Sequence, residues 1–529
     1  MAETTYDVVV IGGGMTGAGV AVDAASRGLK VALVERGDIA SGTSSKSSKM
    51  VHGGLRYLQQ KEFRLVYENL RERQRLLENA PYLVRPLPFL IPLFARNAAM
   101  AKALTKGYGG ALRLYDLSGG WRIGQRHRRV SVDEALAHLP SLNREHLVAG
   151  FIYLDARGDD ARVALTLVRT ALDLGADVLN YAHVESVEHG ETGHSMSVHV
   201  RDALDGSTFA VHARTVVNAT GVWADEVFAL AEHQPSYRVT PAKGVHLSVP
   251  RHRLAADVAA VLSVPHDRRS IFVVPFDDAP YTLIGTTDTP YDGPLDEPEC
   301  TPRDVEYLLS AINSSTSSNL SPADVTGVWA GLRPLLAPRD GEQLTERTSD
   351  LSRRHRVSDS HDGVIHITGG KWTTYRQMAE DTVDALRPYL PGLAKVRTKH
   401  MALHGVGDWR PSSELERHLF ARYGEDAADV VALVAEYPHL GDPMIAGQPY
   451  VGAEFVHAVR HEMALTLEDL LTRRTRAHLH DARTTAAAAT DIAQLVAPEL
   501  GWDDDETARQ IETYLSLVRR EFSAAGLSL

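Results

Sequence analysis

The pattern of hydrophobic and polar positions at the start of the chain predicts a strand, then a helix, then a second strand. The apolar run from Tyr6 to Ile11 predicts a buried parallel strand. Small residues from Thr16 to Arg27 predict a helix that Gly28 ends, and Lys30 to Val34 predicts the next strand. The chain therefore opens with a complete βαβ unit.

Three stretches with different patterns follow this unit. The first mixes helical spacing with short apolar runs, and it predicts helices at 63–79 and 161–174 and strands at 178–181 and 215–218. The second, 236–345, predicts a mostly antiparallel sheet from short β-branched runs at 245–249, 271–274 and 282–284. From about residue 400 the pattern becomes almost entirely helical.

A glycine-rich motif joins the first strand to the first helix. The run from Gly12 to Gly17 matches GxGxxG, in which the glycines allow a tight turn, a close approach of the backbone to a pyrophosphate, and helix–strand packing. We expect Glu35, at the end of the second strand, to accept the ribose hydroxyls. Because Gly369-Gly370 lacks the full pattern, no second dinucleotide unit is evident, and the single cysteine excludes a CxxC redox pair. Together with the N-terminal position of the motif, this favours FAD bound non-covalently.

These patterns predict an α/β fold with a Rossmann-like FAD-binding domain, an antiparallel-sheet substrate domain and a C-terminal helical cap domain. The FAD-binding domain is predicted to be discontinuous, comprising residues 1–85, 150–235 and 345–390. Residues 86–149 and 236–344 would form the substrate domain, and residues 391–529 the separate helical cap.

Composition and charge narrow the class of protein. Hydrophobic residues make up 44% and charged residues 23%, which is ordinary for a soluble enzyme. The net charge of -12 argues against nucleic-acid binding. We find no apolar run of about 18 residues and no basic region before an apolar start, so neither a transmembrane helix nor a signal peptide is predicted. A cytoplasmic location is expected.

Two further segments have the composition of a cofactor and substrate site. The hydroxyl-rich stretch 41–49 suits a diphosphate and a flavin edge, with a flexible linker as the alternative. In the segment 52–57 a glycine pair lets the backbone approach a flat ring, beside a possible base, a guanidinium and a phenol. Asp160 is expected to cap a helix. The pair His461 and Glu462 lacks the second histidine of a metal site and is expected on a helix surface, and no metal site is predicted.

The sequence resembles the FAD-dependent, quinone-linked glycerol-3-phosphate dehydrogenases, within the D-amino-acid-oxidase-like flavoenzymes. The matching pieces span most of residues 6–385, and they read VVVIGGGMTGAG, SGTSSKSSKMVHGGLRYL, VNATGVWAD, KGVHLSV, IGTTDT, GLRPL and GGKWTTYRQMAED. The tail AVRHEMALTLEDLLTRRTR resembles the family's C-terminal helical domain. The HGGLRYL piece with its preceding serine-rich loop is specific, whereas the glycine motif and IGTTD are shared more widely.

The resemblance implies oxidation of sn-glycerol-3-phosphate to dihydroxyacetone phosphate by hydride transfer to flavin N5. His52 or His246 would take the hydroxyl proton, a choice that the sequence leaves open, and the alternative for either histidine is a hydrogen bond to the flavin. Arg333 would assist by lowering the pKa of the alcohol. The implied substrate contacts are Arg56, Tyr57, Arg333 and Lys371. The implied cofactor contacts are Gly12, Gly14, Met15, Thr16, Gly17, Glu35, Arg36, Thr43, Ser44, Ser45, Ser47, His52, Gly53, Gly54, Leu55, Val184, Ala219, Thr220, Gly221, Gly370, Lys371, Thr373 and Thr374.

The resemblance also implies partners. A membrane quinone would accept the electrons, a homodimer is expected, and the protein would lie peripherally on the inner face of the cell membrane. The apolar run Leu87 to Phe94 and the basic residues after it suit anionic lipid headgroups, with an ordinary core segment under a solvated basic face as the alternative. Those basic residues are Arg96, Lys102, Lys106, Arg113, Arg122, Arg126, Arg128 and Arg129.

Three other functions compete with this one. The electron acceptor would be oxygen in a glycerol-3-phosphate oxidase. The substrate would be a carboxylate in an enzyme that oxidises a 2-hydroxy or amino acid, for which the same arginines would serve. A flavin-binding sensor without turnover is the third, and the retained base, arginines and Lys371 argue against it.

Overall fold

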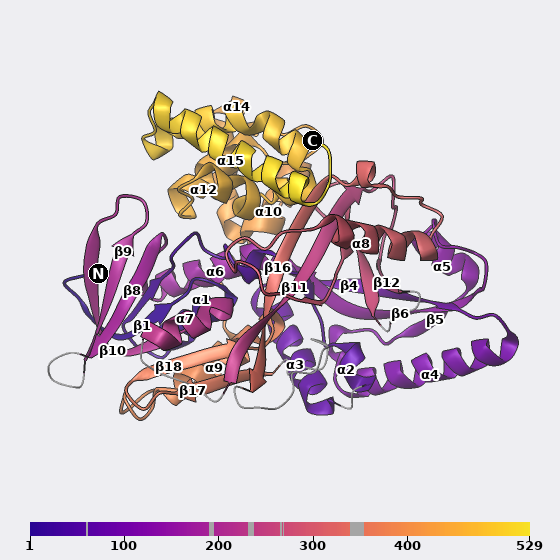
Figure 1. Ribbon diagram of the computed structural model, residues 1–529, viewed down its shortest axis with the longest axis horizontal. Helices are drawn as coiled ribbons and strands as arrows, with labels where there is room; N and C mark the ends of the chain where they lie inside the picture. The colour runs from indigo at the N-terminus through magenta and orange to yellow at the C-terminus, as the bar shows by residue number, and fades with distance from the viewer. Residues whose placement is uncertain (60–61, 190–194, 231–236, 265–266, 268, 339–353) are drawn as a thin grey trace.

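The computed structural model describes residues 1–529 except 60–61, 190–194, 231–236, 265–266, 268 and 339–353 (Figure 1). The side chains of Arg56 and Gln59 also lie outside the described residues. Two sheets lie side by side, and the C-terminal helices lie over them. The predicted fold class is confirmed.

The first sheet is built around the βαβ unit. Its central strands β18, β10, β1, β2 and β7 run parallel, β17 pairs antiparallel with β18, and β8 and β9 form an antiparallel extension. The bounds are β1 (Thr5–Ile11), β2 (Val31–Val34), β7 (Asp177–Leu179), β8 (Ala182–His189), β9 (Met196–Asp202), β10 (Thr208–Asn218), β17 (His355–Asp359) and β18 (Val364–Gly369). Helix α1 (Met15–Ser26) packs against α6 (Asp160–Asp173) and α9 (Tyr375–Ala385). α1 is almost wholly buried, because α6 and α9 pack against it.

The second sheet is antiparallel except where β12 runs parallel to β4. Its strands are β3 (Met50–Val51), β4 (Val84–Phe94), β5 (Arg128–Val130), β6 (Leu147–Gly158), β11 (Tyr237–Pro250), β12 (Ala259–Ser263), β13 (Ser270–Pro275), β14 (Tyr281–Gly285), β15 (Thr289–Pro290) and β16 (Gly327–Pro338). Its flanking helices are α2 (Leu55–Gln59), α3 (Phe63–Asn79), α4 (Ala98–Leu117), α5 (Val132–His138) and α8 (Pro302–Ser315). Helix α7 (Ala224–Leu230) contacts β8 of the first sheet and β11 of the second. The long helix α4 extends to one side of the molecule (Figure 1).

The sheets divide the chain slightly differently from the predicted domain boundaries. The apolar run Leu87 to Phe94 belongs to β4 despite its prolines, and β4 pairs along its length with β6. Strand β6 extends to Gly158, beyond the boundary predicted at residue 150, because it completes the second sheet. The short β3 also pairs with β6, so the segment after the serine-rich loop crosses from the first sheet to the second.

The C-terminal helices share a hydrophobic core with the second sheet. Val245 and Val328 of the sheet lie in one buried cluster with Phe455, Ile492 and Tyr514 of the helices. The helical part is therefore packed on the sheet rather than standing apart from it. The helices are α10 (Glu414–Tyr423), α11 (Ala427–Glu436), α12 (Gly452–His461), the π-helix η10 (Asp469–Arg474), α13 (Ala477–His480), α14 (Ala482–Leu500) and α15 (Asp504–Ala524).

Two predictions about polar residues were wrong. The N-cap of α6 is Asp159, whose carboxylate accepts from the N–H groups of Ala161 and Arg162, whereas Asp160 lies in the first turn and makes buried ion pairs. Glu462 is not on a helix surface: it is fully buried and accepts a hydrogen bond of 2.6 Å from Arg162 Nη1. Burial alone would raise the pKa of Glu462, but the guanidinium of Arg162 holds it at about 2.

Candidate active site

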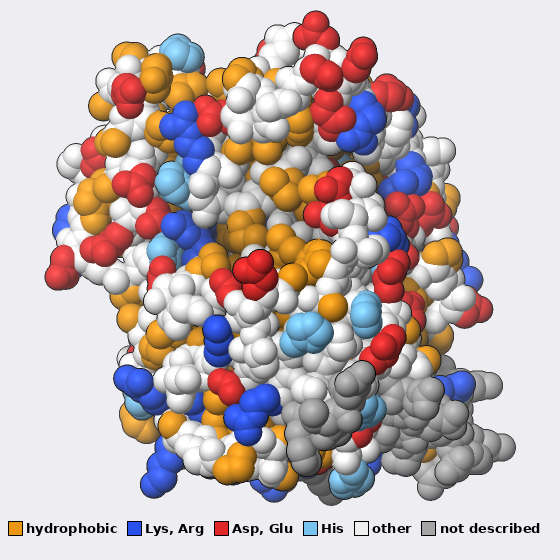
Figure 2. Space-filling view, turned by 90° about the vertical axis from the view of Figure 1, so that its left-hand side faces the viewer, with side chains coloured by type: hydrophobic (Ala, Val, Ile, Leu, Met, Phe, Trp, Pro, Cys, Tyr) orange, Lys and Arg blue, Asp and Glu red, His pale blue; other side chains and the backbone are white. Residues whose placement is uncertain are grey.

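A cavity of about 1630 Å³ lies where the two sheets and the C-terminal helices meet. Its walls come from the glycine turn, the serine-rich loop, strands β11 and β16, and residues of η10, α13 and α15. Figure 2 shows a hollow in one face of the molecule, with hydrophobic side chains on its floor and charged side chains around it. This volume exceeds that of an ordinary small-ligand pocket of about 300–1,000 Å³.

The glycine turn has the geometry that a pyrophosphate site needs. Gly12 has a φ of +110°, and a Cβ there would lie 2.8 Å from Ala219 O. A Cβ on Gly17 would collide with Gly12 O, so the helix start packs directly on the turn. Met15 N donates to Ser44 Oγ at 2.8 Å, which ties the first turn of α1 to the serine-rich loop. The backbone therefore lines the cavity without side chains in the way.

Glu35 lies where the ribose contact is expected, and it already holds the turn together. Its Oε2 accepts from Gly13 N at 2.6 Å, and its Oε1 accepts from Gly37 N at 2.9 Å. Burial raises the pKa of Glu35, although both hydrogen bonds favour the charged form. The next residue, Arg36, stacks over the Trp223 ring at 4.4 Å, on the same wall.

The serine-rich loop is held from behind by buried charges. Asp160 Oδ1 accepts from Lys49 Nζ at 2.8 Å and lies 3.2 Å from Arg476 Nη2, while Asp160 Oδ2 accepts from Ser47 N at 2.9 Å. Lys49 and Arg476 also donate hydrogen bonds to the backbone carbonyl of Ser45. Burial alone would raise the pKa of Asp160, but Lys49 and Arg476 lower it, so the carboxylate stays charged. Asp160 thus fixes the loop conformation.

Arg333 lies at the second-sheet end of the cavity. Its Nη2 donates to Thr286 Oγ1 and to Thr287 O, both at 3.2 Å, and its Nη1 lies 3.6 Å from Asp288 Oδ1. A Cβ on Gly244 would collide with this guanidinium, so the glycine before Val245 makes room for it. The arrangement fixes a planar cation in the cavity wall.

Lys371 and Tyr57 lie together on another part of the wall. Lys371 Nζ lies 3.8 Å from the centre of the Tyr57 ring, and it is 3.4 Å from the position of a Cβ on Gly54. Gly54 has a φ of +80°, which suits glycine and lets the ring lie against the backbone. A second cation therefore lies with Arg333 on the cavity wall, an arrangement that suits an anionic ligand.

Most of the predicted site residues line this one cavity. The residues that do so are Gly12, Gly14, Met15, Thr16, Glu35, Arg36, Thr43, Ser44, Ser45, Ser47, His52, Gly54, Leu55, Tyr57, Val184, Ala219, Thr220, Gly221, His246, Arg333, Gly370, Lys371 and Thr373. Gly17, Gly53 and Thr374 lie behind the wall. Gly53 N donates to Tyr115 Oη and Asp155, and Thr374 Oγ1 donates to Lys371 O. The Arg56 side chain lies outside the described residues.

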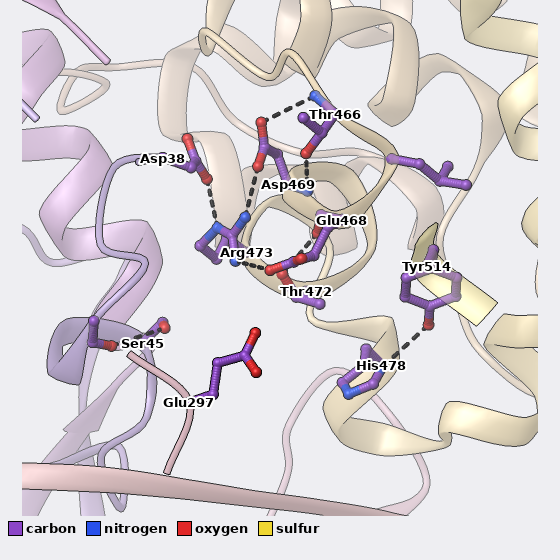
Figure 3. Close-up of polar contacts among 12 residues, drawn as sticks. Asp38, Ser45, Glu297, Thr466, Glu468, Asp469, Thr472, Arg473, His478 and Tyr514 are labelled. Atoms are coloured by element: carbon purple, nitrogen blue, oxygen red, sulfur yellow. Dashed lines mark hydrogen bonds and ion pairs between the residues drawn. The ribbon is translucent and has the colours of Figure 1, made fainter. Parts of the chain in front are cut away.

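Sequence reasoning missed the contribution of the C-terminal helices. Arg473 donates to Asp38 on one side and to Asp469 and Glu468 on the other (Figure 3). Burial alone would raise the pKa of Asp38, but Arg474 and Arg473 lower it. Nothing in the sequence of this helical tail signalled cavity residues, which include Glu468, Thr472, Arg473, Arg476 and His478.

The chain matches known families over nearly its whole length. Residues 7–376 match the FAD dependent oxidoreductase family, and residues 365–507 match the C-terminal domain of alpha-glycerophosphate oxidase. A glycerol-3-phosphate dehydrogenase of Mycobacterium leprae is 42% identical over 533 residues, with 98% of this chain and 88% of the relative covered. The mitochondrial glycerol-3-phosphate dehydrogenase of Homo sapiens is 35% identical over 540 residues, with 96% and 72% covered. Among solved structures, glycerol-3-phosphate dehydrogenase from Bacillus halodurans complexed with FAD has a TM-score of 0.79 and 30% identity, covering 99% of this chain and 96% of that one.

Fold, cavity and sequence together define the class of protein: the chain belongs to the FAD-dependent oxidoreductase family. The open glycine turn, the buried Glu35 and the long cavity fit the dinucleotide that this family uses. Within that class, the chain belongs with the FAD-dependent glycerol-3-phosphate dehydrogenases. The resemblance predicted from the sequence motifs is confirmed.

Proposed function

We propose that the protein oxidises sn-glycerol-3-phosphate to dihydroxyacetone phosphate and passes the electrons to a membrane quinone. The proposed substrate is supported by two cations, Arg333 and Lys371, which lie on the wall of the dinucleotide cavity. A phosphate ester is a dianion and suits a guanidinium and an ammonium together. Bound FAD would accept the hydride from the carbinol carbon at its N5 atom.

The protein's own residues would orient the substrate and take its proton. Arg333 is fixed by Thr286 and Thr287, so its charge has a set direction from which to hold the phosphate or stabilise the developing alkoxide. His246, on β11, is neutral because burial and then the charges of Arg333 and Lys49 hold its pKa well below 6.5. A neutral imidazole can accept a proton. His246 is therefore our preferred base, with the half-buried His52 as the alternative.

An apolar part of the cavity favours a quinone as the electron acceptor. Phe89 and Ile91 of β4, Tyr153 of β6 and Phe272 of β13 line it, together with Tyr108 of α4. Aromatic and aliphatic walls suit a quinone ring better than they suit a polar acceptor. Helix α4 therefore forms part of the wall and also part of the protein surface.

The surface around α4 would bind the cytoplasmic side of a membrane. Met100, Leu114, Leu117 and Trp121 are exposed there, Leu117 to 80%. Exposed basic side chains lie among them, at Arg96, Lys102, Lys106, Arg113, Arg126, Arg128 and Arg129. Every helix in the described part of the chain is too short or too polar to span a bilayer. Basic charge beside apolar side chains suits anionic lipid headgroups.

An anaerobic absorbance titration of the FAD-loaded protein tests the proposed function. Glycerol-3-phosphate, glycerol and a 2-hydroxy acid are added separately, and the reduced samples then receive oxygen or a soluble quinone. Bleaching near ~450 nm by glycerol-3-phosphate alone, followed by faster reoxidation with quinone, is expected from the flavin chemistry. Bleaching by the 2-hydroxy acid instead would favour the carboxylate-oxidising alternative, and faster reoxidation by oxygen would favour the oxidase.

Replacing Arg333 tests the phosphate contact. In Arg333→Ala the KM for glycerol-3-phosphate should rise by about 100-fold, since a charged hydrogen bond contributes about 1.5–3 kcal/mol. Steady-state kinetics with a soluble quinone measures this. Arg253→Ala is the matched control, because that arginine pairs with Asp324 away from the cavity. Unchanged kinetics in Arg333→Ala would exclude the phosphate role.

A further inference from the structure

The hydroxyl of Ser48 connects a buried histidine to the cavity. Ser48 Oγ lies 2.7 Å from His246 Nε2, and Ser48 is one of the residues that line the cavity. Ser48 follows directly after the part of the serine-rich loop that Asp160 holds through the N–H of Ser47. Its position is therefore fixed from behind by the same buried charges that fix the loop.

The imidazole of His246 is enclosed on its other sides. His246 is only 2% exposed, and its ring stacks on the Trp329 indole at 5.2 Å with an interplanar angle of 14°. A Cβ on Gly285, the cross-strand partner of His246 on β14, would collide with the ring. Among the described residues no group hydrogen-bonds Nδ1, which is buried. His246 Nε2 is therefore connected to the cavity through the hydroxyl of Ser48.

The groups around this pair keep the imidazole of His246 unprotonated. Arg333 of β16 and Lys49 of the loop are the nearby cations, and Asp160 of α6 is the opposing carboxylate. Burial is the largest influence and lowers the pKa of His246, the two cations lower it further, and Asp160 opposes them. An unprotonated Nε2 can then accept the Ser48 hydroxyl proton in the hydrogen bond.

We infer that Ser48 is a further catalytic residue, which relays the proton of the substrate hydroxyl to His246. This inference rests on the proposed function, with His246 as the base. The substrate O–H bond breaks as its proton moves to Ser48 Oγ, and the Ser48 hydroxyl proton moves to His246 Nε2. The carbinol C–H bond breaks as a hydride leaves for the oxidised flavin, which is reduced while the alcohol becomes a ketone.

Anaerobic stopped-flow reduction of the FAD-loaded protein by glycerol-3-phosphate tests the relay. Ser48→Ala should slow flavin reduction by about 10²- to 10³-fold, the range for a lost proton-transfer group, with substrate affinity within about threefold of the wild type. Ser48→Thr keeps the hydroxyl and should recover most of the rate. Ser248→Ala is the matched control, since this buried serine lies two residues after His246 on the same strand and away from the cavity lining.

A double variant separates a relay from two independent contributions. Because the two groups would act as one unit, Ser48→Ala combined with His246→Gln should reduce the flavin no more slowly than the slower single variant. Multiplied effects, a wild-type rate in Ser48→Ala, or loss of bound FAD from Ser48→Ala would each overturn the relay. Lack of bleaching of the wild-type protein by glycerol-3-phosphate would instead mean that the proposed function is wrong.

Discussion

Arg476 Nη2 lies 3.2 Å from Asp160 Oδ1, and this buried contact joins the C-terminal helices to the loop that lines the cofactor cavity. The same guanidinium donates to the carbonyl of Ser45 at 2.5 Å. Arg476 is 2% exposed and has a φ of +72°, which is unusual for a residue with a side chain. The helical tail thus contributes directly to the shape of the site.

Arg476→Ala should weaken FAD binding by at least about tenfold and destabilise the fold by about 3 kcal/mol. The physical reason is that a buried carboxylate and a buried carbonyl lose a charged partner. Fluorescence titration of the apoprotein with FAD measures the affinity, and urea unfolding measures the stability. Arg519→Ala on α15 is the control, because its side chain is 51% exposed. Equal FAD affinity in the two variants would contradict this role.

Local patterns sufficed to predict the βαβ unit and the helix at 63–79, whose bounds match those of α3. Those elements follow from hydrophobic periodicity and glycine positions, which are short-range signals. The strand predicted at 245–249 is only part of β11, which extends from Tyr237 to Pro250 because β16 pairs with it along its length. Pairing between distant segments leaves no local signal at the ends of a strand.

Residue roles were harder to predict than elements. The segment 41–49 was recognisable from its hydroxyl density, yet nothing in it distinguished Ser47, whose N–H meets Asp160, from Ser48, whose hydroxyl meets His246. Adjacent residues in the loop differ only in the direction of their side chains. Likewise, the sequence does not reveal that Glu462 is buried, because its partner Arg162 is distant in the chain. Tertiary contacts of this kind need the fold.

Gly17→Ala should abolish stable FAD binding. The new Cβ would collide with Gly12 O, and a backbone carbonyl in a tight turn cannot move aside as a flexible side chain can. The ratio of FAD to protein absorbance after gel filtration measures this. Gly110→Ala on α4 is the matched control, because an added Cβ there meets nothing within 4 Å. FAD content equal to that of the wild type in Gly17→Ala would show that the turn is looser than the structure indicates.

The stability that His404 contributes should be lost as the pH rises above the ordinary pKa of a histidine, about 6.5. Its Nε2 lies 2.9 Å from Asp426 Oδ2 and its Nδ1 lies 2.6 Å from Asp173 Oδ2, and the bond to Asp426 raises the pKa of His404 despite partial burial. The folded state therefore binds the proton more tightly than the unfolded state. Its contribution is complete below about pH 6.5 and is lost as the pH rises through the raised value.

Urea unfolding from pH 6 to pH 9 measures this contribution of His404. The loss of stability with rising pH should be smaller in His404→Gln, whose side chain does not titrate. His400→Gln is the control, because the His400 side chain is 76% exposed. An identical pH dependence in wild type and His404→Gln would show that other groups cause it.

Charge reversal on α4 should weaken binding to anionic vesicles. Lys102 and Lys106 are one helical turn apart and exposed, beside the exposed Met100. Each lysine near an anionic surface contributes about 1 kcal/mol, so the double variant Lys102→Glu/Lys106→Glu should bind at least about tenfold more weakly. Co-sedimentation with vesicles rich in phosphatidylglycerol measures this, and Arg509→Glu/Arg519→Glu on α15 is the matched control. The loss should be larger at low than at high salt, because exposed charges are screened. If wild type and both variants bind alike, or if the wild type prefers neutral vesicles, the basic residues of α4 do not meet the membrane.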